Sequence, residues 1–113
     1  MYKNKSLEER INESTNILQK FPNRIPVIVE KSDKCKDLQV IDKNKYLVPD
    51  DLTFGQFVFV VRKRLKLSAQ KSLFLFINNT LVPTGMLMKE VYDKHADKDG
   101  FLYTLYTSEN TLG

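Results

Sequence analysis

The segment at residues 101–107, FLYTLYT, constrains the fold most strongly, because it is apolar on both faces of a strand. Alternate residues of a strand point to opposite faces, which puts Phe101, Tyr103 and Leu105 on one side and Leu102 and Tyr106 on the other. A strand with two apolar faces lies inside a sheet that is covered on both sides. We therefore predict an internal strand at residues 101–107.

Residues 6–21 are predicted to form the first helix. Ser6 followed by Glu9 matches a capping box, and Pro22 ends the segment. The apolar residues at helical spacing are expected to face a core: Leu7, Ile11, Leu18 and Phe21.

Residues 51–67 combine two conflicting signals. The run FVFVV has high strand propensity, whereas the apolar residues recur at helical spacing: Phe54, Phe57, Val58, Val61 and Leu65. Thr53 and Gln56 match a second capping box, and the run 62–64 (RKR) suits a helix C-terminus. We therefore predict a helix here. A third, short helix is expected over residues 85–95, with Thr84 as its N-cap and one face made by Met88, Val91, Tyr92 and His95.

The other predicted strands are RIPVIVEK (24–31), KYLVP (45–49), and a pair within 72–83 joined at an Asn-Asn turn. The order is helix, two strands, helix, two strands, short helix, strand, which favours a compact α+β domain. We expect a single domain over 1–113, with an N-terminal helical segment (1–21), a sheet-containing core (22–107) and a flexible tail (108–113).

Composition limits the classes of function. The single cysteine, Cys35, lies in a polar stretch and is interpreted as an incidental surface thiol. No apolar run is long enough to span a membrane, and residues 1–10 lack a signal-peptide core, so the unmodified chain is expected in the cytoplasm. The net charge of +4 suits anionic lipid, acidic peptide or nucleic acid without choosing among them.

The residues offer no catalytic pattern. His95 is the only histidine and is expected to be partly buried, and none of the four glycines belongs to a phosphate-binding loop. The chain is interpreted as a binding or carrier module, not an enzyme, without cofactor or metal. A basic cluster remains open to two readings, a solvated helix end or a face for an acidic partner: Arg62, Lys63, Arg64, Lys66 and Lys71.

Three stretches carry a resemblance to a known family: FPNRIPVIVEK, DKNKYLVPDDLTFGQFVFVVRKRLKL and LFLFINNTLVP. In this order they resemble the autophagy-related ubiquitin-like modifiers, the family of GABARAP and microtubule-associated protein light chain 3. The resemblance implies a ubiquitin-like β-grasp fold with an N-terminal helical extension. The family usually has two N-terminal helices, so the first is expected to be absent or rudimentary here, and Leu112 stands where the family commonly has an aromatic residue.

The resemblance also implies binding of aromatic-x-x-aliphatic peptides along the strand at 45–49. The implied aromatic pocket consists of Glu13, Ile17, Pro26, Ile28, Lys45, Leu47 and Phe101. The implied aliphatic pocket consists of Tyr46, Val48, Pro49, Leu52, Phe57 and Val60. Arg24, Lys45 and Arg64 would attract acidic residues that flank such peptides.

Finally, the resemblance implies conjugation of Gly113 to phosphatidylethanolamine by activating and conjugating enzymes, with a deconjugating cysteine protease to reverse it. The conjugate would sit on autophagosomal or related membranes. Two other hypotheses stay open: an unconjugated adaptor of vesicle traffic or the cytoskeleton, and a basic nucleic-acid-binding module.

Overall fold

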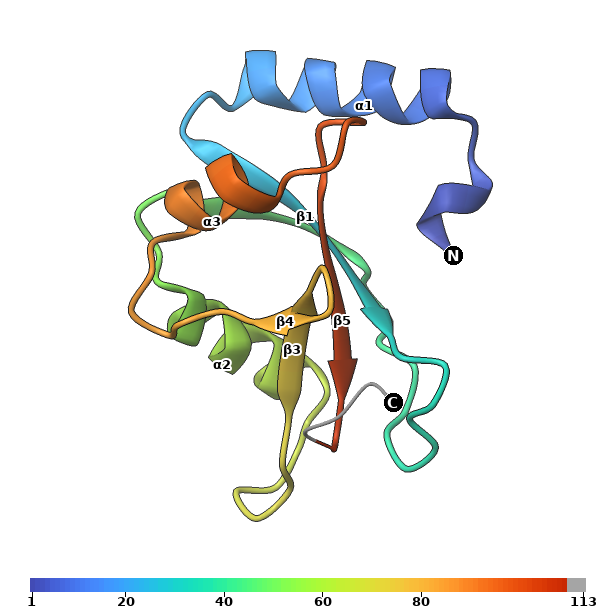
Figure 1. The fold of residues 1–113 in the computed structure, drawn as a ribbon, viewed down its shortest axis with the longest axis vertical. Helices are drawn as coiled ribbons and strands as arrows, with labels where there is room; N and C mark the ends of the chain where they lie inside the picture. The colour runs from blue at the N-terminus through green and yellow to red at the C-terminus, as the bar shows by residue number, and fades with distance from the viewer. Residues whose placement is uncertain (110–113) are drawn as a thin grey trace.

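The computed structural model describes residues 1–109 and contains one five-stranded sheet in the order β2-β1-β5-β3-β4 (Figure 1). The elements are η1 (a 3-10 turn, Tyr2–Asn4), α1 (Leu7–Lys20), β1 (Arg24–Lys31), β2 (Lys45–Pro49), α2 (Phe54–Arg64), β3 (Phe74–Ile77), β4 (Thr80–Leu81), α3 (Met88–His95) and β5 (Leu102–Thr107). Their order is the one predicted, with η1 as the rudimentary first helix. The further division into residues 1–21, 22–107 and 108–113 stays a prediction.

Strand β5 is internal, as its two apolar faces predicted. It pairs in parallel with β1 and antiparallel with β3. Leu102 and Tyr106 are fully buried in the main core, which α2 and α3 cover, whereas Phe101 joins Ile28 and Tyr2 in a second cluster on the other face of the sheet. This second cluster lies under η1 and α1, so helical segments cover both faces of the sheet.

The segment with conflicting signals is helix α2. Thr53 accepts a hydrogen bond from the Gln56 amide at 3.1 Å, and the Gln56 side chain accepts one from the Thr53 amide at 2.9 Å, which completes the predicted capping box. Phe54, Phe57 and Val61 are buried. Helical spacing therefore outweighs strand propensity here, because it places these side chains on one face over the sheet.

The prediction that Thr84 caps α3 is wrong, because α3 begins at Met88 after an N-cap at Leu87. Residues 84–86 instead accept hydrogen bonds from the first turn of α2. The amides of Phe54 and Gly55 donate to the carbonyls of Met86 (2.8 Å) and Thr84 (2.9 Å). These bonds satisfy two of the N–H groups that a helix start leaves without partners. The predicted inner face of α3 is confirmed: Met88 and Val91 are buried, and Tyr92 and His95 are partly buried.

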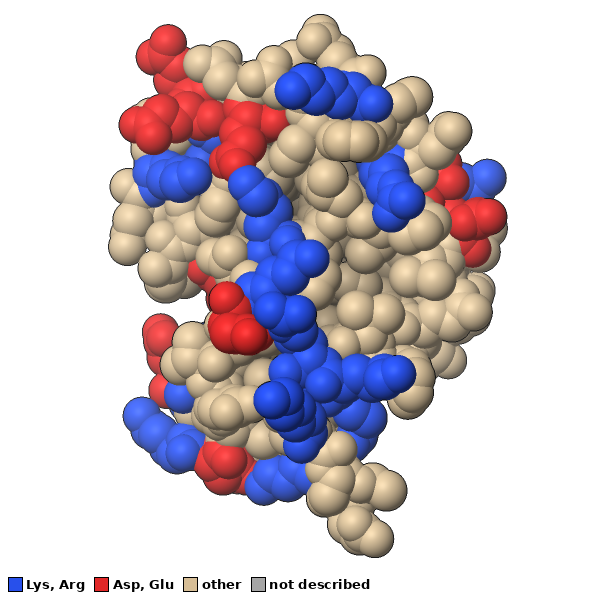
Figure 2. Space-filling view, turned by 180° about the vertical axis from the view of Figure 1, so that it is seen from behind, with Lys and Arg blue, Asp and Glu red and all other residues tan. Residues whose placement is uncertain are grey.

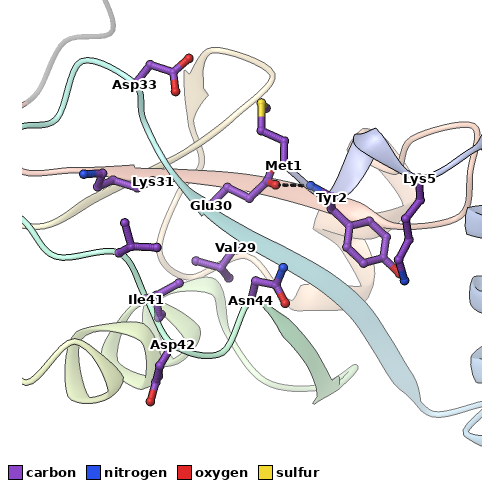
Figure 3. Close-up of a pocket in the computed structure, with 11 residues that line it drawn as sticks. Met1, Tyr2, Lys5, Val29, Glu30, Lys31, Asp33, Ile41, Asp42 and Asn44 are labelled. Carbon is purple, nitrogen blue, oxygen red and sulfur yellow. Dashed lines mark hydrogen bonds between the residues drawn. The ribbon is translucent and has the colours of Figure 1, made fainter.

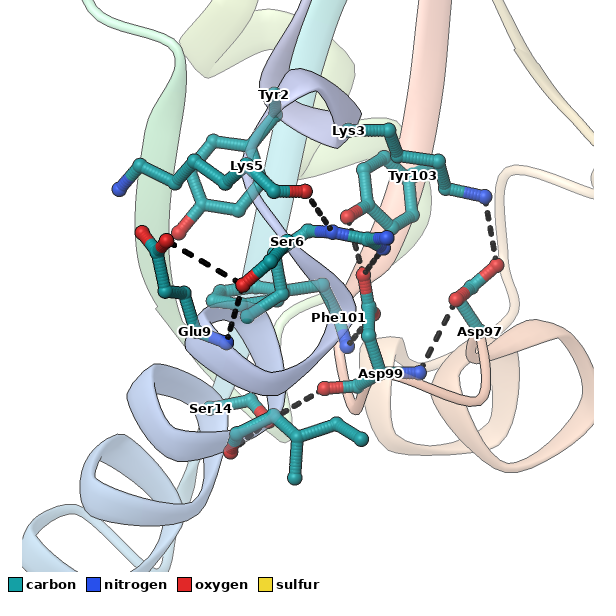
Figure 4. A network of polar contacts seen from close by, with 12 residues as sticks. Tyr2, Lys3, Lys5, Ser6, Glu9, Ser14, Asp97, Asp99, Phe101 and Tyr103 are labelled. Carbon is teal, nitrogen blue, oxygen red and sulfur yellow. Dashed lines mark hydrogen bonds and ion pairs between the residues drawn. The ribbon is translucent and has the colours of Figure 1, made fainter.

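The expected core face of α1 is wrong for three of its four residues, and the fourth, Leu18, is partly buried. Leu7, Ile11 and Phe21 are 38%, 39% and 44% exposed, whereas the polar residues Arg10 and Ser14 are buried. Arg10 forms an ion pair with the buried Asp99 carboxylate at 2.6 Å, and Ser14 donates to the Asp99 carbonyl at 2.5 Å (Figure 4). Polar partners in the turn before β5 thus select the face of α1 that is buried.

Cys35 is a core residue, not the surface thiol that its polar neighbours suggested, since it is only 3% exposed. The connection from β1 to β2 folds back onto the sheet and buries Leu38 and Ile41 beside it. The Tyr106 hydroxyl holds this connection in place: it accepts from the Ile41 amide at 2.9 Å and donates to the Gln39 carbonyl at 2.5 Å.

Gly100 provides a test of the contact between α1 and the turn before β5. Its φ is +90°, and a Cβ there would collide with the Ser14 side chain. We expect Gly100→Ala to lower the free energy of unfolding by at least about 1–2 kcal/mol, the cost of positive φ for a residue with a side chain. Gly85→Ala is the control, because a Cβ at Gly85 meets nothing within 4 Å. Equal stability of both variants in urea titrations would contradict this role of Gly100.

Two core tyrosines provide a second test. The Tyr46 hydroxyl is buried and has no hydrogen-bond partner among residues 1–109, and burial raises the pKa of this phenol. We expect Tyr46→Phe to leave stability unchanged or to raise it, because an unpartnered polar atom is removed. Tyr106→Phe should cost about 1–3 kcal/mol, because the Ile41 amide and Gln39 carbonyl lose their partner. Thermal unfolding of both variants checks this, and an equal loss in both would contradict it.

Candidate functional site

Strand β2 is an edge of the sheet, because β1 is its only neighbour within the described residues. Tyr46 pairs with Val27, and Pro26, which has no N–H, lies opposite Leu47. In an antiparallel pair the bonding residues alternate, so Tyr46 bonds to β1 while the N–H and C=O of Lys45 and Leu47 point away from the sheet. The Arg24 guanidinium donates to the Leu47 carbonyl at 3.1 Å. This edge therefore offers backbone groups to an added strand.

A hollow of about 270 Å³ lies between α1 and β2. It is lined by Glu13, Asn16, Ile17, Lys20 and Phe21 from α1 and its end, and by Lys45 and Leu47 from β2. Four predicted residues of the aromatic pocket, Glu13, Ile17, Lys45 and Leu47, are thus brought together. Lys45 forms an ion pair with Glu13 at this hollow, and Lys5 lies 3.5 Å from the same carboxylate.

The other three residues predicted for the aromatic pocket lie deeper. Ile28 and Phe101 are fully buried in the second cluster, and Pro26 is buried beside Leu47. In the free protein they support the hollow from below and do not line it.

The predicted aliphatic pocket is divided between core and surface. Tyr46, Val48 and Phe57 are buried in the main core, where the rings of Tyr46 and Phe57 meet edge to face at 5.8 Å. Leu52 is partly buried, Pro49 is exposed and Val60 is 39% exposed. These last three are the members accessible from solvent, and Val60 lies on α2.

The basic cluster contains structural and surface residues. Arg62 donates to the carbonyls of Ser68 (2.9 Å) and Lys71 (2.6 Å), and so holds the connection after α2. Arg64 forms two hydrogen bonds to Asp42, which lower the pKa of that carboxyl. Arg64 is therefore already paired in the free protein. Lys63 and Lys66 are exposed.

A second hollow, of about 620 Å³, lies where the N-terminal turn meets β1 (Figure 3). The Tyr2 amide donates to Glu30 at 2.6 Å across this contact. Burial raises the pKa of Glu30. None of the residues predicted for peptide binding lines this hollow, and Glu30 acts here as an anchor for the N-terminal turn.

Sequence reasoning missed Asn16, Lys20 and Phe21 as members of the hollow between α1 and β2. A signal was present, because Glu13, Ile17 and Phe21 are spaced by four residues and share one helix face. Phe21 was assigned to the core because it is apolar. Gly113, the predicted conjugation residue, lies outside the described residues.

Within residues 1–109, no group of three or more His, Cys, Asp or Glu side chains is placed to bind a metal ion. In the same part of the chain, no helix is both long and apolar enough to cross a membrane.

Comparisons with known proteins point to one family. The family model "Autophagy protein Atg8 ubiquitin like" matches residues 9–113. The chain is 59% identical to autophagy-related protein 8a of Arabidopsis thaliana, over 95% of this chain and 87% of the relative. It is 60% identical to autophagy-related protein 8 of Kluyveromyces lactis, over 94% of this chain and 85% of the relative.

Solved structures of similar fold include ATG8 of Trypanosoma brucei, with a TM-score of 0.89 and 42% identity over 99% of this chain and 97% of that one. Another is Plasmodium falciparum Atg8 in complex with a peptide of Plasmodium falciparum Atg3, with a TM-score of 0.86 and 36% identity over 94% of this chain and 93% of that one. These neighbours confirm the α+β, ubiquitin-like β-grasp fold. The chain belongs to the Atg8 family of ubiquitin-like autophagy proteins.

Proposed function

We propose that this protein is a modifier, not an enzyme, that docks aromatic-x-x-aliphatic peptides at β2 and is conjugated through Gly113 to phosphatidylethanolamine. The observation that carries the docking half is the outward-facing edge of β2 with a hollow beside it. In this proposal the free chain is cytoplasmic, and the conjugate sits on autophagosomal or related membranes.

A bound peptide would extend the sheet by one strand. Its backbone would pair with the outward N–H and C=O groups of Lys45 and Leu47, as in other cases of strand addition. Arg24 donates to the Leu47 carbonyl, an acceptor that it would share with a peptide N–H or give up to it. In either case its guanidinium would lie close to the peptide, where it would attract an acidic residue beside the motif.

The spacing of the motif follows from the two faces of β2. Residues three apart on an extended strand are about 10 Å apart and point to opposite faces. The aromatic side chain would enter the hollow on the α1 side, beside Ile17 and Leu47. The aliphatic side chain would then reach the α2 side, where Leu52 and Val60 are accessible.

The hollow can be tested without disturbing the core. We expect the double variant Ile17→Ala/Leu47→Ala to bind an aromatic-x-x-aliphatic peptide at least about tenfold more weakly, since both side chains lose apolar contact with the aromatic group. Both residues are only partly buried, so the fold should persist, unlike that of a variant truncated at the core residue Tyr46.

Calorimetric titration measures this affinity, and circular dichroism confirms that the variant is folded. Val40→Ala is the control, because Val40 is 71% exposed and lies in the connection between β1 and β2. Unchanged affinity in the folded double variant would refute docking at this hollow.

The conjugation half is supported by the family match, which extends through Gly113. The carboxylate must be activated before it can form an amide, which requires an ATP-dependent activating enzyme and then a conjugating enzyme. A peptide of the Atg3 type, as bound by the Plasmodium falciparum relative, would be one ligand for the docking edge. A deconjugating cysteine protease would release the protein again.

Reconstitution tests the conjugation half. We expect the chain that ends at Gly113 to gain the mass of phosphatidylethanolamine when incubated with activating and conjugating enzymes, ATP and liposomes. Gly113→Ala should not gain it, because a Cβ obstructs the narrow sites through which the terminus must pass. Intact-mass spectrometry reads both outcomes. A wild-type chain that never gains this mass would favour the unconjugated adaptor.

A further inference from the structure

Asp37 holds the last described residues against the connections at one end of the sheet. Its carboxylate accepts a hydrogen bond from the Ser108 hydroxyl at 2.5 Å and forms an ion pair with Lys71. The Lys71 ammonium and then the Ser108 hydroxyl lower the pKa of this carboxyl. Ser108 therefore lies beside the connections that follow β1 and precede β3, at the end of the molecule opposite α1 (Figure 1).

These connections, together with the ends of β1 and α2 that lead into them, carry the excess positive charge of the chain. Residues 31–37 and 62–71 contain eight Lys and Arg and two Asp, a formal charge of +6. The whole chain carries +4, so the remaining residues sum to −2. Figure 2 shows Lys and Arg in a band that runs down one face of the molecule to this end. Four of the lysines are exposed: Lys34, Lys36, Lys63 and Lys66.

Lys66 occupies a backbone position that disfavours a lysine. The amides of Lys66 and Leu67 donate to the carbonyls of Lys63 (3.0 Å) and Arg62 (3.3 Å), which is a Schellman ending of α2. The residue at this point has φ of +57°, where glycine or asparagine is favoured. The exposed Lys66 thus occupies a position where the geometry of the helix end alone would favour glycine or asparagine.

The geometry of the tail brings this end close to any lipid attached at Gly113. Five residues follow Ser108, and a chain of that length spans at most about 18 Å. The described protein measures 39 × 30 × 23 Å, so most of it lies farther away than the tail can reach. The connections around Ser108 are the part that must stay near the headgroups.

We propose that this basic end, residues 31–37 and 62–71, lies on the membrane in the conjugated protein, and that Lys34, Lys36 and Lys66 bind anionic lipid headgroups. The inference rests on the lipid attachment proposed above. An anionic surface strengthens binding by roughly fivefold for each Lys or Arg held near it. In the proposed function, acidic peptides would bind elsewhere, at the β2 hollow, which Lys20 and Lys45 line.

Chemical attachment tests the orientation without any conjugating enzyme. Gly113→Cys is coupled to a maleimide lipid in vesicles with or without phosphatidylserine, and intact mass verifies a single attachment, since Cys35 is only 3% exposed. Exposed lysines are then acylated with a water-soluble reagent and read by mass spectrometry. The control lysines lie on or just after α3 and are also exposed: Lys89, Lys94 and Lys98.

We expect Lys34, Lys36 and Lys66 to react at least about threefold more slowly on phosphatidylserine vesicles than on neutral ones, with no change at the control lysines. Equal labelling on both vesicles, or protection of the control lysines instead, would overturn the proposal. Because the lipid is attached chemically, a failure of enzymatic conjugation of Gly113 would contradict the proposed function without changing this result.

A charge-matched pair of variants tests the same surface in the unattached protein. Lys34→Glu/Lys36→Glu/Lys66→Glu should weaken binding to phosphatidylserine vesicles at low salt at least about tenfold, measured by cosedimentation. The same three changes at the control lysines, which alter the net charge equally, should weaken it less than about threefold. If both triple variants lost vesicle binding equally, only the net charge would matter. If the Lys34/Lys36/Lys66 variant kept vesicle binding but lost affinity for an acidic peptide, these lysines would belong to a peptide site. Either result would refute the proposal.

Discussion

The buried ion pair between Arg10 and Asp99 determines where α1 lies, and the proposed docking site depends on that placement. The guanidinium and carboxylate are 2.6 Å apart, and Tyr103 donates to the same carboxylate. The hydrogen bond to Asp99 raises the pKa of Arg10, and burial followed by the bond to Asp99 raises that of Tyr103. Removing either Arg10 or Asp99 would leave the other charge buried without its partner, which would be costly. Residues Glu13 and Ile17, one and two turns further along α1, are thereby held beside β2.

This ion pair also explains what sequence analysis could predict. The internal position of β5 and the helical state of α2 follow from local patterns, because each depends on apolar residues that lie close together in the sequence. The buried face of α1 does not, because Arg10 and Asp99 are 89 residues apart and only the folded chain brings them together. Cys35 was misjudged for a related reason: polar neighbours indicate an exposed connection, but Leu38 and Ile41 draw this one into the core.

The residues of the proposed docking site were predicted from the family resemblance. The geometry of β2 shows which of them are accessible and which are buried. Residues 45 and 47 face the α1 side of β2, and residues 46 and 48 face the main core. Lys45 and Leu47 are therefore accessible, whereas Tyr46 and Val48 provide support from within. Sequence alone could not separate these roles for Ile28 or Phe101, since core and pocket residues have the same apolar character.

The proposed docking edge and membrane-facing end occupy opposite ends of β1. Leu47 lies beside Pro26, near the start of β1, whereas the end of β5 pairs with Lys31. Five residues of strand separate these points, about 17 Å. Lipid attachment at the Ser108 end would therefore leave the hollow at the α1 end facing away from the bilayer. Strand β1 thus separates the proposed docking edge from the proposed membrane-facing end. A protein held on a membrane by its tail could therefore still bind a peptide at β2.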